Sequence, residues 1–307
     1  MAVLPGGHSL ITSVGFAQES VWLHDAKGER AVSSEGSASE PQFSSDGKKL
    51  FFLVKKGAAR LFGSGELWTM DVASGQSERL LPGIDLTRYA ISPDTKRVVF
   101  AAVANDGKSR LWVGSLEQRF APREMPIPDQ SSPLYAPNGL IYARASEGKA
   151  NYAYRMKEDG TNRQRVVENP VVDLVSISPD GQWIVGGMTS SSEDHHVQIV
   201  AISTAGRTIR PICDACVAGW SADAKNFVLT IARLAFRNRE KAYLIPLPSG
   251  QGLPPIPPAG FNSERDLAKF SGVRIIDRGA VVVGTSPTTY AFLQATVHRN
   301  LFQIPLP

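Results

Sequence analysis

The chain has 307 residues, of which 42% are hydrophobic and 20% are charged, so its composition is that of a folded protein and excludes a disordered or fibrous one. It has no run of the roughly 20 apolar residues that a transmembrane helix needs, and its first residues lack the basic start and cleavage site of a signal peptide. The 33 basic residues exceed the 29 acidic ones only slightly, and the net charge is +4.

The densest basic patch does not favour nucleic-acid binding. Only Phe236 is interleaved with its basic residues, and no nucleic-acid-binding motif accompanies it. The patch consists of Arg233, Arg237, Arg239 and Lys241. We expect a solvated loop there.

One unit recurs along the chain, and residues 172–204 show it in full. An apolar run, 172–177, meets the turn Ser178-Pro179-Asp180-Gly181, and a second apolar run, 183–185, follows. Pro presets φ at the second turn position, and Gly accepts the positive φ that other residues resist. After a polar loop, a third run covers 197–202. Such runs, bounded by turns, indicate β-strands.

The turn recurs at intervals of 48, 44, 42, 43 and 54 residues, counted from Asp46. Its seven instances in chain order are 4–7, 44–47, 92–95, 136–139, 178–181, 221–224 and 276–279. A period of about 44 residues with four short strands per unit is typical of a β-propeller blade. The sequence therefore predicts an all-β, seven-bladed β-propeller of four-stranded antiparallel blades, as a single domain over residues 1–307.

The third strand of each unit carries an aromatic or large apolar residue, as at Trp22, Trp68, Trp112, Tyr154 and Tyr243. We expect these side chains to pack between neighbouring blades rather than to stack on a ligand. No fourth strand is apparent after the last unit, so either the N-terminal segment supplies it or the blade lacks it.

An insertion at 246–272 interrupts the repeat. Its Pro-rich first half cannot join a central strand, because Pro has no N–H to donate to the ladder. Asn262-Ser263-Glu264 favours a short helix through Lys269, with Asn262 or Ser263 as its N-cap.

The Ser-Pro-Asp-Gly turns, with segments such as Leu67-Trp68-Thr69-Met70-Asp71, resemble the TolB-like propeller repeats, which are related to WD repeats. The segments 243–248, 266–274 and 297–307 also resemble the C-terminal propeller of bacterial membrane-anchored Ser/Thr protein kinases. The kinase Gly-rich loop, catalytic Asp motif and DFG triplet are absent from this sequence, so the chain itself would not phosphorylate a substrate.

The kinase resemblance implies a non-enzymatic propeller that binds a protein or small-molecule ligand as the extracytoplasmic sensor region of a receptor kinase. Any membrane attachment would then come from an upstream segment. One alternative is a TolB-like periplasmic scaffold that binds a protein partner. The resemblance implies an extracytoplasmic location, and a cytoplasmic one stays open. No cofactor is expected.

Both cysteines of the chain lie in the motif Cys213-Asp214-Ala215-Cys216, where one blade passes to the next. A disulfide that pins this crossover, two packed thiols, and part of a metal site are all compatible with the spacing. A structural zinc site would need a second pair of ligands, which the sequence lacks. Oxidation would fit the extracytoplasmic location that the resemblance implies.

The segment Ser191–His196 places Glu193 and Asp194 beside His195 and His196, which are residue types that bind divalent metals. Adjacent residues of a strand point to opposite faces, so a solvated loop is the better interpretation. A ring can also gather distant residues, and the five histidines are His8, His24, His195, His196 and His298. A metal-dependent propeller enzyme acting at the central channel is therefore a further alternative.

The ring itself predicts where a ligand binds. First strands line the central channel, and the loops that lead into them form one mouth of it. Convergent polar groups at a concave mouth are the default binding site, although they could also be hydrated walls. The candidate residues are Glu40, Gln42, Arg88, Tyr89, Asp173 and Asp214.

Overall fold

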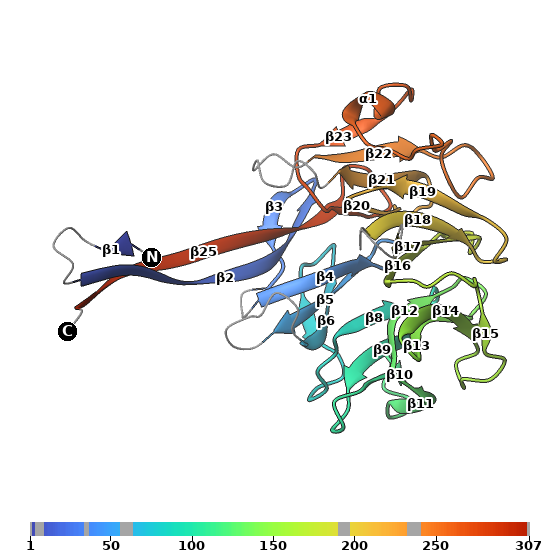
Figure 1. Cartoon of the computed structure of the whole chain (residues 1–307), viewed down its shortest axis with the longest axis horizontal. Coiled ribbons are helices and arrows are strands. Elements are labelled where there is room, and N and C mark those ends of the chain that lie inside the picture. Colours follow the sequence, from blue (N-terminus) through green and yellow to red (C-terminus); the bar gives the residue numbers. More distant parts are fainter. Residues whose placement is uncertain are drawn as a thin grey trace.

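The computed structural model describes residues 2–3, 9–33, 37–55, 64–189, 197–231 and 241–305. Within these residues the strands form six antiparallel sheets arranged as a ring, so the fold is a β-propeller of four-stranded blades (Figure 1). We number blades 1 to 5 in chain order and call the sheet that contains both terminal strands the terminal blade.

Each of the first five blades runs from an inner strand to an outer strand in sequence order. Blade 1 contains β4 (Ser37–Phe43), β5 (Lys49–Lys55), β6 (Glu66–Asp71) and β7 (Ser77–Arg79). Blade 2 contains β8 (Arg88–Ile91), β9 (Arg97–Val103), β10 (Ser109–Ser115) and β11 (Arg123–Pro128). Blade 3 contains β12 (Gln130–Tyr135), β13 (Ile141–Glu147), β14 (Ala150–Met156) and β15 (Gln164–Arg165). Blade 4 contains β16 (Asp173–Ile177), β17 (Trp183–Thr189), β18 (Val197–Ser203) and β19 (Ile209–Cys213). Blade 5 contains β20 (Cys216–Trp220), β21 (Asn226–Ile231), β22 (Ala242–Pro246) and β23 (Arg274–Ile276).

The predicted turns join the first and second strands, and a shared hydrogen-bond pattern fixes them. The Ser178 hydroxyl donates to Oδ1 of Asp180 at 2.5 Å and accepts the Trp183 N–H at 2.8 Å. Gly181 adopts φ +71°. The same Ser–Asp pairing occurs at Ser44, Ser92 and Ser221. The recurrent sequence motif is therefore a recurrent structural unit.

The prediction of seven blades is wrong, because the first and last repeats belong to one sheet. In the terminal blade, β24 (Val282–Val283) and β25 (Tyr290–Pro305) come from the end of the chain, whereas β2 (Ser9–Asp25) and β3 (Gly28–Ala31) come from its start. β2 and β25 pair from His24↔Tyr290 to Ser9↔Pro305. Both ends of the chain thus close one blade, and two degenerate repeats appear where there is one sheet.

The paired β2 and β25 continue beyond the ring as a two-stranded ribbon (Figure 1). The Glu19 N–H donates to the Ser37 hydroxyl of blade 1, which marks where the ribbon meets the ring. At the far tip, β1 (Ala2–Val3) pairs with Leu10 and Ile11 of β2. We call Ser9–Gln18 together with Thr296–Pro305 the ribbon.

The core consists of apolar layers between neighbouring sheets, as the repeat predicts. Each of the five aromatic residues of the third strands packs in or against such a layer, which confirms the expected structural role. They are Trp22, Trp68, Trp112, Tyr154 and Tyr243.

The insertion extends the layer between blades 4 and 5. Leu253, Phe261 and Leu267 are buried in that layer. The predicted helix is present as α1 (Glu264–Leu267), with Ser263 as its N-cap, and it ends two residues earlier than expected. Within the described residues, no helix is long and apolar enough to span a membrane.

Candidate binding site at the ring axis

The inner strands place polar side chains from separate blades around one end of the ring axis. β12 packs against both β8 and β16, and β16 packs against β20, so consecutive inner strands are neighbours. Arg88 and Asp173 are the first residues of β8 and β16, and Glu40 lies within β4. Residues from the inner strands of separate blades therefore lie at this end of the axis.

Arg88 joins three blades through two ion pairs. Its Nη1 lies 3.1 Å from Oε2 of Glu40 in blade 1, and its Nη2 lies 3.4 Å from Oδ2 of Asp173 in blade 4. All three side chains are between 33% and 41% exposed, so the group remains in contact with solvent. The structure thus brings three of the six predicted residues into direct contact.

Tyr89 fixes the backbone of Glu40, one member of this group. Its hydroxyl donates to the backbone carbonyl of Glu40 at 2.6 Å. Burial, together with the Glu40 carboxylate, raises the pKa of the Tyr89 hydroxyl well above its ordinary value. The hydroxyl therefore stays protonated and keeps donating. It holds Glu40 at a β-bulge, where φ is +55°.

Ser132 completes the group and was missed by the sequence analysis. It lies at a bulge in β12 with φ +52°, and its hydroxyl donates to the Asp173 carboxylate. Asp173 also accepts the Leu174 N–H at 2.9 Å. A serine in a strand carries no motif, and a bulge has no fixed sequence pattern, so only the three-dimensional structure reveals it.

Gln42 and Asp214 do not join this group. Gln42 lies opposite Phe51, two residues further along β4 than Glu40. Asp214 lies in the turn between β19 and β20, where it accepts a hydrogen bond from the Gln198 side chain at 3.4 Å. Within the described residues, neither is among the hydrogen-bonding or ion-pair partners of Arg88.

Apolar side chains face solvent on the inner strands of blades 4 and 5. Val175 of β16 is 39% exposed, and Val217 of β20 is 47% exposed. An inner-strand side chain can be this exposed only where solvent reaches the inner surface of the ring. The axis therefore offers a charged side, built around Arg88, and an apolar side, built from two valines.

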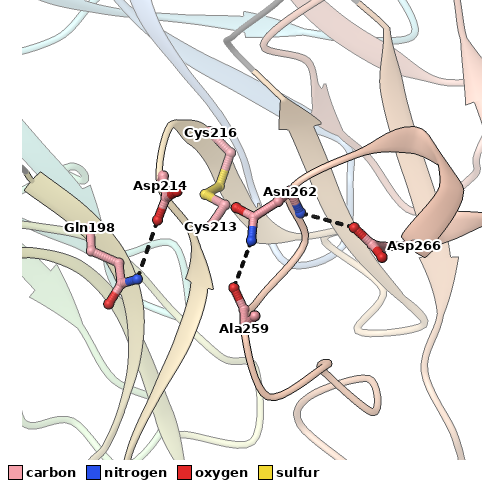
Figure 2. The surroundings of a disulfide bond; sticks show 7 residues. All are labelled: Gln198, Cys213, Asp214, Cys216, Ala259, Asn262 and Asp266. Atoms are coloured by element: carbon pink, nitrogen blue, oxygen red, sulfur yellow. Dashed lines mark hydrogen bonds between the residues drawn. A yellow bond between two sulfur atoms is a disulfide. The ribbon is translucent and has the colours of Figure 1, made fainter.

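The predicted cysteine pair forms a disulfide at the crossover from blade 4 to blade 5 (Figure 2). Cys213 and Cys216 are both buried, with a Cα–Cα distance of 6.1 Å. The insertion is fastened beside them, because the Phe261 N–H donates to the Ile212 carbonyl at 2.6 Å. The disulfide thus stabilises the segment on which the insertion docks.

Two sequence hypotheses fall outside the described residues. They are the Ser191–His196 loop and most of the basic patch, Arg233, Arg237 and Arg239. Among the residues that the structure does describe, no three His, Cys, Asp or Glu side chains are placed to bind one metal ion. The metal-dependent enzyme stays a prediction.

No family model matches this chain, and no curated protein matches it. Several solved structures do match it. A putative TolB from Agrobacterium tumefaciens is 16% identical with a TM-score of 0.62, covering 91% of this chain and 99% of its own. TolB from Acinetobacter baumannii is 17% identical with a TM-score of 0.57, covering 76% of this chain, which spans 64% of its length. An oligogalacturonate lyase in complex with manganese is 14% identical with a TM-score of 0.50, covering 72% of this chain and 66% of its own. The fold is TolB-like.

Proposed function

We propose that the chain is a non-enzymatic, TolB-like scaffold that binds a segment of a partner protein at the Arg88 end of the ring axis, outside the cytoplasm. The observation that carries this proposal is the composition of the axis. Arg88, Glu40 and Asp173 offer charges of both signs, and Val175 and Val217 offer exposed apolar surface on the inner strands of blades 4 and 5. Interfaces combine such apolar and polar groups.

The arrangement of the charges favours recognition over chemistry. Arg88 is held by two carboxylates, and Asp173 also accepts hydrogen bonds from Ser132 and Leu174. A partner can exchange these ion pairs for its own without leaving a charge unpaired. Partial exposure keeps the cost of that exchange small, because half-exposed ion pairs contribute only about 0–1 kcal/mol.

The disulfide supports the extracytoplasmic location. Disulfides persist in oxidising compartments and are rare in the cytosol. Cys213–Cys216 is buried and lies within the layer that joins two blades, so it is part of the folded core. The likeness to the two TolB structures supports the same proposal through the fold.

A photo-crosslinking amino acid at Val217 tests this proposal in cells of the source organism. We expect a covalent adduct with a partner protein that disappears when Arg88→Ala is combined with the probe. The same amino acid at Phe120, which is 41% exposed outside the inner strands, is the matched control and should give no such adduct. An adduct that survives Arg88→Ala contradicts binding through the charged side.

The finer proposal is that the scaffold is the sensor region of a receptor Ser/Thr kinase. Its support is the resemblance of segments 243–248, 266–274 and 297–307. Most of the first lies in β22, most of the second in the insertion, and residues 297–305 of the third in the ribbon. The complete reading frame tests it. An upstream kinase domain and membrane helix support the sensor, and a signal peptide directly before residue 2 contradicts it.

A further inference from the structure

The ribbon differs in composition from the rest of the chain. Ser9–Gln18 contains no charged residue, and Thr296–Pro305 contains only Arg299, although 20% of the whole chain is charged. Near the tip, Leu301 is 77% exposed, Phe302 47% and Ile304 45%. Because successive strand residues point to opposite faces, Leu301 and Phe302 make both faces of the tip apolar.

One edge of the ribbon offers backbone groups for pairing. β24 pairs with β25 only at Tyr290 and Ala291. From Leu293 to Phe302, β25 has no strand on that side in the part of the chain that the structure describes. Natural proteins protect long edge strands with lysine, proline, bulges or cover, and this edge carries Arg299 alone. An apolar, regular edge of this length is suited to receive another strand.

The exposed surface of the chain is large for its mass. A compact monomer of 33.2 kDa exposes about 12,600 Å², and this chain exposes 16468 Å². The ribbon stands outside the ring and contributes to this difference (Figure 1).

We propose that this chain self-associates through the ribbon, with the β25 edge of one copy pairing antiparallel with the β25 edge of a second copy. This inference is independent of the proposed function. Antiparallel pairing of two identical edges is self-complementary about a two-fold axis. It would join the strands into one continuous sheet and place Leu301 and Phe302 of each copy beside side chains of the partner's strand, with both rings at the outer ends of the joined ribbons.

A lipid surface is the competing occupant, and the edge argues against it. Lipid can cover both apolar faces of the tip, but it cannot satisfy the N–H and C=O groups between Leu293 and Phe302. Open sheet edges do not occur in the hydrocarbon region of a bilayer for this reason. A second strand satisfies these N–H and C=O groups by hydrogen bonding, and it adds lateral contacts to the side chains.

Sedimentation of the purified chain between about 1 and about 100 µM tests the proposal, because interfaces of modest area have dissociation constants in that range. We expect a monomer–dimer equilibrium. The variant Leu301→Lys/Phe302→Lys should raise the dissociation constant of the dimer at least about tenfold, since lysine on an edge opposes pairing. Both side chains are exposed, so the ring should fold unchanged. Ile275→Lys, on a 59% exposed residue of the outer strand β23, is the matched control and should dimerise normally.

Cross-linking gives a second readout. The only two cysteines form the disulfide, so Asn300→Cys introduces one reactive thiol on the edge. The two-fold axis falls near the middle of Leu293–Phe302, so the two introduced thiols lie about five residues apart along the joined strands. A bifunctional thiol reagent of about 17 Å should therefore link two copies, and it should not link Ile275→Cys. A wild-type chain that stays monomeric over the whole range overturns the proposal, as does a dimer that persists in Leu301→Lys/Phe302→Lys. Flotation of a monomeric chain with anionic lipid vesicles, lost in the same variant, would assign the ribbon to lipid and overturn it too.

Discussion

Arg88 Nη2 lies 3.4 Å from Oδ2 of Asp173, although 85 residues separate them in the sequence. Arg88 begins the inner strand of blade 2, and Asp173 begins the inner strand of blade 4. The ring brings equivalent positions of its repeats to one end of the axis. This contact is therefore a product of the repeat, and its use as a binding site follows from the side chains placed there.

Replacing Arg88 with alanine should separate binding from stability. Because the ion-paired side chains are about 40% exposed, we expect the free energy of unfolding to change by less than about 1 kcal/mol. Partner capture at the axis should be lost. Thermal unfolding and the Val217 crosslinking assay measure the two effects. Arg97→Ala is the matched control, since Arg97 pairs with Glu158 at the other end of blade 2 and is 46% exposed. Equal loss of capture in both variants would contradict the proposed site.

Removing the disulfide should destabilise the chain. Closing a loop as short as Cys213–Cys216 lowers the conformational entropy of the unfolded chain. On the chain-entropy model this stabilises the folded state by about 2 kcal/mol. We expect Cys213→Ser/Cys216→Ser to lose about this much in urea unfolding. The wild-type chain should fall to the same stability in a reductant, and the double variant should not respond. A reductant effect on the double variant would show that another process is responsible.

Two glycines with nearly equal φ should differ in their tolerance of alanine. Gly206 has φ +73° and Gly250 has φ +74°, so both backbones disfavour a side chain. An added Cβ at Gly206 would overlap the Val166 carbonyl oxygen of blade 3, whereas at Gly250 it meets nothing within 4 Å. We expect Gly250→Ala to cost about 1 kcal/mol and Gly206→Ala clearly more. Chemical denaturation measures both, and equal costs would contradict close packing of blade 4 against blade 3.

The Ser–Asp turns should make stability sensitive to acid. The Ser44 hydroxyl lowers the pKa of Asp46, and the Ser92 hydroxyl lowers the pKa of Asp94. A carboxylate with a lowered folded pKa stabilises the fold above its unfolded pKa of about 3.9, and that contribution is lost as the pH falls below it. The free energy of unfolding should therefore drop between about pH 5 and about pH 3.

Asp46→Asn/Asp94→Asn isolates the contribution of these turns, since asparagine cannot titrate. We expect this variant to be less stable than the wild type near neutral pH and to lose less stability on acidification. Urea unfolding along a pH series measures the difference. Parallel curves for the two proteins would assign the acid sensitivity to other carboxylates.

Local signals in the sequence predicted most of the fold. The turn at Ser178–Gly181 fixes φ and its own hydrogen bonds within a few residues, so it can be read without knowing the structure. The count of blades was wrong because the pairing of β2 with β25 joins opposite ends of the chain, and no local pattern encodes it. The ribbon was missed for the same reason.

The candidate site was predicted in part for related reasons. Glu40, Arg88 and Asp173 were found because the repeat places equivalent positions at the axis. Ser132 was missed because it reaches Asp173 only through a bulge. Asp214 was included by the same rule, yet its strand begins beside a disulfide-linked turn, where it accepts from Gln198 instead.

The terminal blade also constrains how the chain is made. Blades 1 to 5 can fold as the ribosome releases them, because each is contiguous in sequence. β2 and β3, although synthesised before blades 1 to 5, must wait for β25, which is synthesised after them. Until then β2 is exposed and able to pair wrongly with another nascent chain. Chaperones that shield extended segments should therefore bind β2 and β3 while blades 1 to 5 are being made.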